Sequence, residues 1–399
     1  MIRTHDVVIV GGGLVGASLA IALDGQGLDV ALVEASAADA LPAVFDQRNL
    51  SLAAASVNAL HKLGVFQALQ APTGAIRAIH VSRAGDFGRV WLQASDYGRE
   101  SFGQVVVARD FGLALEARLA SVAGLTRYRP ARFTGLDPAG GGFRRLRLAG
   151  AEGELELGAR LLVGADGSAS GVRQALGIGS RDHDYGQTLF VARVRAERAP
   201  DGTAYERFTD SGPTAFLPRG DRAWGVVHGV AGADAAAVAA LDEPAWLARL
   251  QAVFGWRAGR LLASGERSAY PLQSKVAEAL VAPRAVLLGN AAQTIHPIGA
   301  QGFNLGLRDA LTLAELLRAG PADPGDAGLL QHYARRREED RSRTLAFSDG
   351  LARLTGNRSR LLRPLRSLGL VAADRAAWLQ AWLVGGAMGF RGDVPELCR

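Results

Sequence analysis

One segment near the start of the chain constrains the fold more than any other. Residues 6–23 read DVVIVGGGLVGASLAIAL, a short apolar strand that runs into glycines and then into a helix. A strand that is apolar on both faces belongs inside a parallel sheet covered by helices. Gly11, Gly13 and Gly16 form the pattern G-x-G-x-x-G, which permits a tight turn, close approach of a pyrophosphate, and close packing of helix on strand. The helix N-terminus would then offer unpaired N–H groups to phosphates.

A second apolar strand, residues 29–36, carries Glu34. A carboxylate about twenty residues beyond the glycines accepts hydrogen bonds from ribose hydroxyls in dinucleotide sites. The glycines alone could form an ordinary turn, and Glu34 alone could be a solvated strand end. Their order along the chain nevertheless predicts a dinucleotide-binding unit.

Composition limits the classes of protein that remain. The chain has 399 residues, of which 48% are hydrophobic and 21% charged, so it is long enough for two or more lobes. The net charge of +6 is carried almost entirely by arginine and could favour a phosphate-bearing cofactor or a membrane surface. No basic stripe is interleaved with aromatic residues, so we expect no nucleic-acid partner.

The same composition bears on the cellular setting. Cys398 is the single cysteine, which excludes a disulfide within the chain and fits a reducing, cytoplasmic environment. We recognise no signal peptide before the first strand and no apolar run of the ~18 residues that a membrane-spanning helix needs. Any contact with the inner membrane is therefore expected to be peripheral.

A second strand-to-loop motif lies in the middle of the chain. Residues 159–178 form an apolar strand that ends in Gly164, Asp166 and Gly167, followed by a helix that contains Arg173. The segment is not a serine nucleophile elbow, because Ala169 stands where that motif needs its serine. By itself it could be a turn with a helix cap.

A third motif follows an apolar strand that ends at Gly289. The loop GNAAQTIHPIGAQGFNLG, residues 289–306, leads into a helix predicted from about Gly302 to Leu317. His296 makes no metal-ligand spacing with another histidine, so we predict no metal site and a loop-packing role for this side chain.

Together the three motifs resemble the FAD-dependent aromatic hydroxylases related to p-hydroxybenzoate hydroxylase. Residues 45–66, 296–317 and 361–390 are most similar to the ubiquinone-biosynthesis hydroxylases that act on polyprenylated phenols. The resemblance spans nearly the whole chain and implies a mixed α/β (α+β) fold: a Rossmann-like FAD-binding domain with a parallel central sheet, an antiparallel-sheet substrate domain and a C-terminal helical region. The expected bounds are 1–75, 100–180 and 275–345 for the FAD-binding domain, 76–99 and 181–274 for the substrate domain, and 346–399 for the helical region.

The resemblance also implies roles for individual residues. The glycines of the first motif and Glu34 would hold the ADP half of FAD. Arg48 would lie along the pyrophosphate, although it could instead pair with Asp46 at the surface. Arg109 would lie near the ribityl chain, or it could be an ordinary charge at a helix start. The cofactor-binding set implied in this way is Gly11, Gly13, Gly16, Glu34, Arg48, Arg109, Asp166, Gly167, Asn290, Gly302, Phe303 and Asn304.

Asn290 departs from the family pattern, which has an aspartate that binds a ribityl hydroxyl. An asparagine keeps an acceptor oxygen but loses the charge, so we expect a weaker contact. Pro297 would pack near the flavin ring, and backbone amides from Gly299 to Asn304 would stabilise negative charge on it. The predicted surroundings of the reacting ring are Pro297, Gly299, Gln301 and Gly302, and no general base can be named.

The activity implied is hydroxylation of a lipophilic phenol in ubiquinone biosynthesis, through a flavin hydroperoxide formed with NAD(P)H and O₂. Two alternatives remain: a flavin-dependent reductase or dehydrogenase acting on an isoprenoid, and a non-catalytic FAD-fold subunit of a biosynthetic complex. Phe216, Pro218 and Trp224 could line the substrate pocket, but strand core is the interpretation we favour.

The C-terminal segment offers two readings. Trp378 and Trp382 fall on one helical face, beside arginines at 353, 358, 360, 363 and 366. This helix could dock on the body of the protein, or it could present a surface to a membrane or a biosynthetic complex. The oligomeric state is left open.

Overall fold

The N-terminal strand β1 (Arg3–Val10) lies inside a sheet whose order is β18-β19-β11-β1-β2-β8. This computed structural model describes residues 2–37, 39–138, 140–356 and 363–399. β1 pairs in parallel with β2 and β11, and the next pairs outward, β2 with β8 and β11 with β19, are also parallel. Residues 7–10 of β1 are buried, as expected for a strand covered on both faces.

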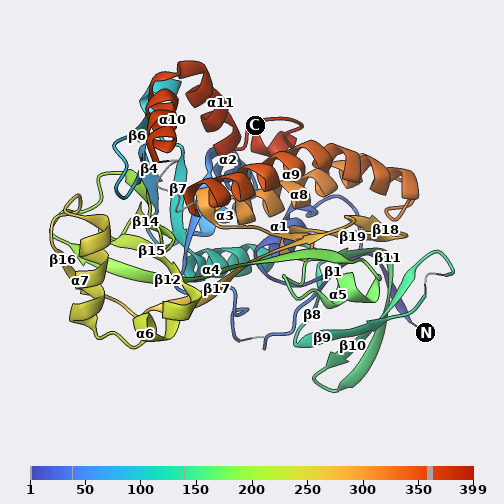
Figure 1. The fold of residues 1–399 in the computed structure, drawn as a ribbon. Helices are drawn as coiled ribbons and strands as arrows, with labels where there is room; N and C mark the ends of the chain where they lie inside the picture. Colours follow the sequence, from blue (N-terminus) through green and yellow to red (C-terminus); the bar gives the residue numbers. More distant parts are fainter. Residues whose placement is uncertain (1, 38, 139, 357–362) are drawn as a thin grey trace.

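Helices cover this parallel sheet (Figure 1). Helix α1 contacts both α4 and α8, and α9 packs on α8, while α5 packs against the β9–β10 hairpin. The elements of this part are α1 (Leu14–Ala22), β2 (Val30–Val33), α4 (Ala108–Leu119), β8 (Thr126–Tyr128), β9 (Ala131–Leu136), β10 (Arg144–Gly150), β11 (Gly153–Gly164), α5 (Gly171–Ala175), β18 (Val281–Ala282), β19 (Ala285–Leu287), α8 (Gln301–Arg318) and α9 (Ala327–Gly356).

A second large sheet has the order β20-β17-β12-β15-β14-β13-β5-β6, with β16 paired to β12. All of its pairs are antiparallel except β13 with β5, which is parallel. Helix α7 covers one face, where Trp246, Leu250 and Phe254 join a core with Phe190 and Trp224. The elements are β5 (Ala78–Arg83), β6 (Arg89–Gln93), β12 (Ser180–Ala196), β13 (Thr203–Phe208), β14 (Pro213–Pro218), β15 (Trp224–Ala231), α6 (Ala235–Ala239), α7 (Glu243–Phe254), β16 (Leu261–Ser264), β17 (Ser268–Ala277) and β20 (Gln293–Thr294).

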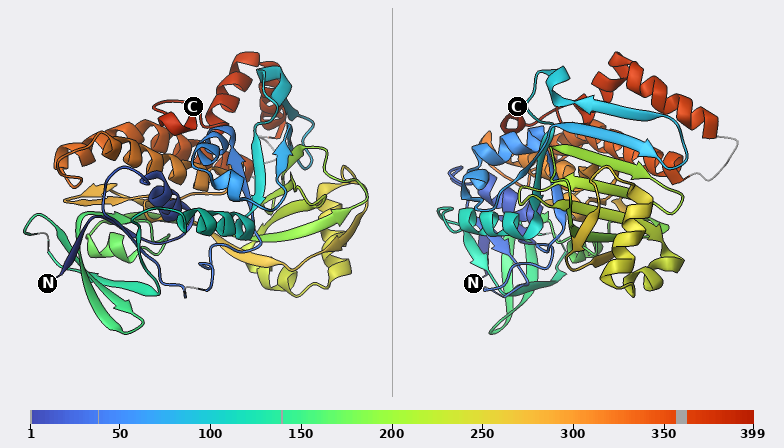
Figure 2. Two further views of the ribbon diagram at one scale, coloured as in Figure 1. Left: turned by 180° about the vertical axis from the view of Figure 1, so that it is seen from behind. Right: turned by 90° about the vertical axis from the view of Figure 1, so that its left-hand side faces the viewer.

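A small third sheet, of order β3-β7-β4, stands between the two larger ones, as Figure 2 shows. Its strands are β3 (Asn49–Ala53), β4 (Gly74–Ile76) and β7 (Gly103–Val107), and the helices α2 (Ala54–Lys62) and α3 (Val65–Ala68) follow β3 along the chain. Gly74 of β4 approaches the carbonyl of Pro218 so closely that a Cβ would lie 1.9 Å from its oxygen. The small sheet therefore packs directly against β14 of the second sheet.

The C-terminal helices close the side of the molecule next to the β5–β6 hairpin. Helix α10 (Arg363–Arg375) packs on β6 and contacts α11 (Ala377–Ala387), and Figure 2 shows α10 lying over the strands of this hairpin. The chain end, η5 (Glu396–Cys398), returns to α2 and buries Cys398. Among the described helices, each is too short or too polar to cross a lipid bilayer.

This architecture confirms the predicted fold class. The late helix predicted from about Gly302 to Leu317 is α8, one residue longer at each end. The bounds of the three regions stay a prediction. The second sheet continues past residue 274, the predicted end of the substrate domain, because it includes the end of β17 and all of β20. Of the arginines predicted to accompany the exposed tryptophans, Arg358 and Arg360 lie outside the described residues.

A buried ion-pair network joins α8 to α9. Asp340 accepts hydrogen bonds from Arg308 at 2.7 Å and Arg337 at 2.6 Å, and Arg337 also donates to Asp309 at 2.8 Å. All four side chains are buried. Burial alone would raise the pKa of Asp340, but the two guanidinium groups outweigh it and hold that pKa far below its usual value. This network fixes the helix whose N-terminus reaches the site described below.

Removing Asp340 should therefore destabilise the protein strongly. The variant Asp340→Ala leaves two buried arginines short of a partner, and we expect a loss of about 3–5 kcal/mol in the free energy of unfolding by urea. Because the folded pKa of Asp340 is lowered, its contribution is present above about pH 4 and is lost as the pH falls.

The neighbouring residue provides the control. The Glu339 side chain is 70% exposed and pairs with Arg343 at 2.7 Å, so Glu339→Ala should cost about 0.5 kcal/mol or less. Equal losses of unfolding free energy in the two variants would contradict the large stabilisation that we assign to the buried network.

Candidate cofactor and substrate site

The first glycine turn has no room for side chains. Gly11 has a φ of +108°, and a Cβ there would lie 2.4 Å from the carbonyl oxygen of Ala165. A Cβ on Gly16 would lie 1.9 Å from the carbonyl oxygen of Gly11. Gly13 precedes the first turn of α1 and, like Gly11, lines a large cavity. The turn thus brings the N-terminus of α1 to that cavity, as a phosphate-binding turn requires.

Glu34 lies at the end of β2 and also lines the cavity. Its carboxylate accepts hydrogen bonds from the backbone N–H groups of Gly12 at 2.8 Å and Ser36 at 2.7 Å. A carboxylate has about four acceptor positions. Glu34 is therefore fixed in place and keeps acceptor capacity for the hydroxyls of a ribose.

The middle motif is held by its own side chains. Asp166 accepts hydrogen bonds from Ser170 Oγ at 2.5 Å and from the N–H of Val172 at 3.1 Å, and Ser170 caps α5. Gly167 has a φ of +86° and would have no atom within 4 Å of an added Cβ. Asp166 and Gly167 both line the cavity, and the space next to Gly167 is open.

Arg173 ties the middle motif to the late loop. Its guanidinium is buried and donates to the carbonyl oxygens of Ser168 and Ala291, both at 2.9 Å. Arg173 belongs to the middle sequence motif, and in the structure its side chain holds that motif to the late loop. The two loops therefore lie side by side at the same edge of the parallel sheet.

Arg48 makes the predicted pair with Asp46, and its predicted place along the pyrophosphate stays a prediction. It pairs with Asp46 at 2.7 Å and also lines the cavity. Tyr270 of β17 donates to Asp46 at 2.6 Å, and the Arg48 guanidinium lies 4.5 Å from the centre of the Tyr270 ring. The Asp46 carboxylate outweighs burial and raises the pKa of Arg48. Tyr270, which sequence reasoning missed, is distant in the chain and carries no local motif.

The late loop approaches the cavity through glycines. A Cβ on Gly306 would lie 2.9 Å from the Cα of Gly289, so α8 packs directly on the start of the loop. Gly299 has a φ of +74°, and an added Cβ on Gly302 would meet no atom within 4 Å. Asn290 lines the cavity from the first turn of this loop. Pro297, Gly299 and Gly302 line it as well.

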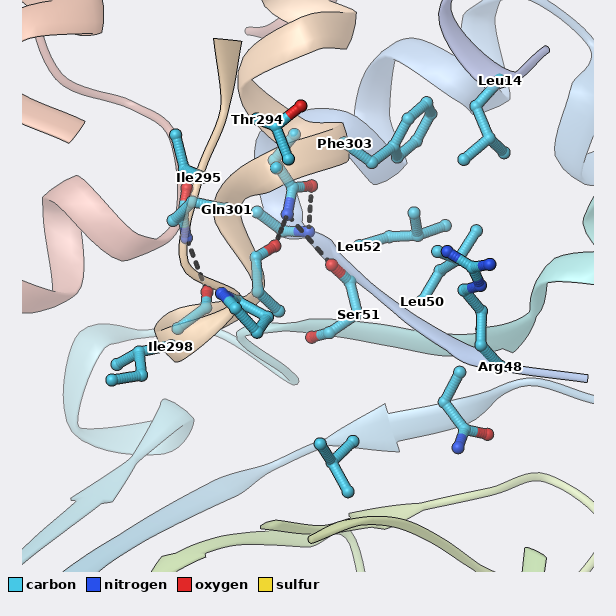
Figure 3. Close-up of a pocket in the computed structure, with 18 of the residues that line it drawn as sticks. Leu14, Arg48, Leu50, Ser51, Leu52, Thr294, Ile295, Ile298, Gln301 and Phe303 are labelled. Atoms are coloured by element: carbon cyan, nitrogen blue, oxygen red, sulfur yellow. Dashed lines mark hydrogen bonds between the residues drawn. The ribbon is translucent and has the colours of Figure 1, made fainter. Parts of the chain in front are cut away.

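The side chains that open α8 serve mainly as tethers. Asn304 donates to the carbonyls of Ser51 at 2.9 Å and Ala300 at 2.8 Å, and it accepts from the N–H of Ala53 at 2.8 Å. Gln301 donates to Gly299 at 3.0 Å and to Ala387 of α11 at 3.2 Å. Figure 3 shows Gln301 and Arg48 at separate parts of one pocket, with Leu50 and Leu52 of β3 between them.

Phe303 also lines the pocket and meets Phe111 of α4 edge-on, with 5.5 Å between ring centres. With the tethers of Gln301 and Asn304, this contact fixes the first turn of α8. Its backbone, rather than its polar side chains, is therefore the part available to a ligand.

His296 is buried beneath the loop. Its Nδ1 accepts the N–H of Ile298 at 3.2 Å, its ring meets Tyr185 edge-on, and its carbonyl accepts from Ser348 at 2.8 Å. Burial lowers the pKa of His296 to about 4, so the ring is neutral at pH 7. The packing role predicted for His296 agrees with these contacts. Across the described residues, no group of three or more His, Cys, Asp or Glu side chains could hold a metal ion.

Two predicted cofactor residues lie outside the cavity lining. Arg109 is exposed at the start of α4, and its N–H donates to the carbonyl of Asp46 at 2.8 Å. Gly16 is buried where α1 crosses the turn. Their roles toward a cofactor stay predictions. Phe216 and Trp224 belong to the core beneath α7, as favoured from the sequence.

The cavity has a volume of about 1360 Å³ and connects all three motifs with the second sheet. This exceeds the ~300–1,000 Å³ of typical small-molecule pockets, so the cavity has room for more than one small ligand. Its far end is mainly apolar, although Arg83, Asp86 and Glu206 also line it. The apolar residues there come from β5, β6 and β14, from α9, and from the C-terminal helices and the residue after them, namely Ile79, Val81, Val90, Leu92, Ala215, Leu217, Phe347, Leu351, Leu370, Ala373, Leu383, Val384 and Met388.

Comparison with known proteins gives a consistent result. The profile of a family described as an FAD binding domain matches residues 4–348. The chain is 35% identical to the ubiquinone hydroxylase UbiL of Rhodospirillum rubrum, covering 99% of this chain and 92% of that protein. It is 31% identical to the 3-demethoxyubiquinol 3-hydroxylase of Escherichia coli, covering 96% and 98%.

A solved structure supports the fold. The p-nitrophenol 4-monooxygenase PnpA from Pseudomonas putida superposes with a TM-score of 0.80 at 17% identity, covering 98% of this chain and all of that one. At this identity the likeness shows the fold alone.

The departure at Asn290 generates a testable expectation. Asn290→Asp should tighten FAD binding about 3- to 10-fold, because a charged acceptor strengthens a hydrogen bond by roughly 1 kcal/mol. The measurement is a fluorescence titration of protein stripped of flavin. Gln67→Glu, which adds a charge at an exposed and remote position, should leave the dissociation constant unchanged. Unchanged or weaker binding by Asn290→Asp would mean that this side chain does not contact the cofactor.

Proposed function

The chain belongs to the FAD-binding family of flavin-dependent hydroxylases, and we propose that it hydroxylates a lipophilic, polyprenylated phenol in ubiquinone biosynthesis, using FAD, NAD(P)H and O₂. The observation that carries this proposal is the single cavity that joins a dinucleotide cradle to an apolar chamber. The names of the relatives support the same class of substrate.

The cofactor end of the cavity fits FAD. Gly11 and Gly13 would accommodate the pyrophosphate against the N-terminus of α1, Glu34 the ribose, and Arg48 the phosphate charge. Gly302 leaves open space at the first turn of α8, where unpaired N–H groups point outward. Bound FAD would supply the redox chemistry that protein side chains lack. Asp166 and Gly167, at the same cavity, would face the NAD(P)H that donates electrons.

The far end of the cavity suits a phenol with an isoprenoid tail. Apart from Arg83, Asp86 and Glu206, the side chains that line the chamber are aliphatic or aromatic, so an apolar tail would be removed from water along most of its length. The same walls exclude water from the reaction. Leu370 and Ala373 of α10 and Val384 of α11 form one wall, so the C-terminal helices would lie over the tail.

Purified protein supplied with FAD should bind it and turn yellow. With NAD(P)H and a phenol that carries a three-isoprene tail, we expect oxygen uptake matched by product that is heavier by one oxygen atom derived from ¹⁸O₂. Reduction of the isoprenoid without oxygen uptake would replace this proposal with a reductase. Failure to bind FAD at all would indicate a non-catalytic subunit.

The outer surface of the same helices suits a membrane interface. Trp378 is 74% exposed, Leu368 57% and Trp382 45%, and Arg391 lies 4.4 Å from the ring centre of Trp382. Exposed aromatic and aliphatic side chains beside a cation are typical of helices that rest in the lipid headgroup region. A peripheral position would let the apolar chamber receive a substrate from the bilayer, so we assign this surface to anionic lipid.

The double variant Trp378→Ser/Trp382→Ser should weaken binding to phosphatidylglycerol-containing vesicles by about 10-fold or more, since each buried indole contributes on the order of 1 kcal/mol or more. Co-sedimentation measures the effect. Trp256, which is 67% exposed on the loop after α7, provides the control, and Trp256→Ser should bind vesicles like the unaltered protein. Equal binding by all three proteins would remove the membrane assignment.

A further inference from the structure

A carboxylate interrupts the apolar face of the second sheet inside the cavity. Cross-strand pairing aligns Val90, Val81, Glu206, Ala215 and Val227 in one row across β6, β5, β13, β14 and β15. All five residues line the cavity. The other four are aliphatic and can only exclude water, so Glu206 is the one ionisable side chain in this row.

The alternation along β13 fixes the face on which Glu206 lies. Tyr205 meets Phe254 of α7 edge-on at 5.4 Å, and Arg207 donates to the carbonyl of Val253 at 2.8 Å. Both neighbours therefore point to the helix-covered face. Because side chains alternate along a strand, Glu206 lies on the opposite face, with Ala204 and Phe208, which also line the cavity.

Glu206 has no hydrogen-bond or ion-pair partner among the residues that the structure describes. Two charged groups on the elements around it have partners of their own. Arg83 of β5, which also lines the cavity, pairs with Asp210 at 2.6 Å, and Asp374 of α10 accepts from the N–H of Trp91 at 2.8 Å. At the cofactor end, Arg48 pairs with Asp46. Asp86, after β5, also lines the cavity and has interactions of its own.

An unpaired carboxylate in apolar surroundings is costly to keep charged. Burial raises the pKa of Glu206 to about 7. A side chain that titrates near neutral pH can both take up and release a proton under working conditions, which is the property expected of a general base.

We propose that Glu206 is the general base that accepts the hydroxyl proton of the phenol substrate, an inference that rests on the proposed function. A phenol with a pKa of about 10 is ionised in roughly one molecule in a thousand at pH 7, yet ionisation makes the ring far more electron-rich. Glu206 stands in the wall of the substrate chamber, where a ring lying between the sheet and α8 would meet it.

The proton balance of the step is complete. The O–H bond of the phenol breaks, its electron pair stays on the phenol oxygen, and the proton moves to the Glu206 carboxylate. One atom of O₂ then bonds to the ring carbon, and that carbon's own proton restores the hydroxyl of the product. The other oxygen atom leaves as water. NAD(P)H supplies a hydride, which amounts to two electrons and one proton, and solvent supplies one further proton. These two protons and the one held by Glu206 are the three that the new hydroxyl and the water require.

The first test compares Glu206→Gln with Glu154→Gln, a control at an exposed position of β11. With the prenylated phenol, Glu206→Gln should lower the hydroxylation rate about 100-fold. NAD(P)H oxidation should continue and yield hydrogen peroxide instead of product, and the melting temperature and FAD affinity should stay within the range of the control. Glu206→Asp should recover part of the lost rate if the carboxylate itself acts.

Two further readouts separate a base from a merely structural side chain. The hydroxylation rate of the unaltered protein should rise with pH through about 7, because the carboxylate must be ionised to accept a proton, and Glu206→Gln should lose that rise. With ring-fluorinated phenols of lower pKa, the gap between the two proteins should shrink to about 10-fold or less, since a more acidic phenol needs less help. A gap that stays constant, together with an unchanged pH profile, would overturn the inference.

A turnover-independent measurement distinguishes this inference from the proposed function. Infrared difference spectra between phenol-bound and phenol-free oxidised protein should contain a carboxyl band that Glu206→Gln lacks. If that band is present but no hydroxylated product forms, the contact stands and the proposed function fails. If hydroxylation proceeds but both proteins give the same spectra, the assignment of Glu206 is wrong.

Discussion

The close approach of three backbone loops at one edge of the parallel sheet determines where everything else lies. Gly11 touches the backbone at Ala165, Gly16 crosses Gly11, and Gly306 rests on Gly289. Side chains at these crossings would force the loops apart, so glycine is required by space and not by flexibility alone. As a consequence, the N-termini of α1 and α8 both face one cavity, and their dipoles favour negative charge at two places in its cofactor end.

Local geometry explains why so much could be predicted from the sequence. A strand, a glycine turn and a helix occupy consecutive residues, so the three motifs and the helix α8 are readable without knowledge of distant contacts. The direction in which a side chain points is harder to predict from the sequence. Arg109 is the second residue of α4, and its side chain is exposed and does not line the cavity. Its role near the ribityl chain stays a prediction, because a sequence does not reveal which face of a helix start will meet a neighbouring domain.

Residues from the second sheet were the least predictable. Tyr270 supports Arg48 through Asp46 across more than two hundred residues of chain, and no motif signals such a contact. Glu206 looks like an ordinary solvent-facing residue of an alternating strand. Only the pairing of β13 between β5 and β14 places it within an aliphatic row, because non-local register decides which face of a strand is enclosed.

The apolar chamber therefore has two effects that cannot be separated. Its aliphatic walls keep water away from the reacting ring, and the same walls raise the pKa of the Glu206 carboxyl toward neutrality. An arginine or lysine beside Glu206 would hold the carboxylate charged and lower that pKa, making it a poor acceptor for a phenol proton. Among the described residues, Glu206 has no cationic partner. Its carboxyl can therefore accept a proton near neutral pH, in the same wall that binds an apolar substrate.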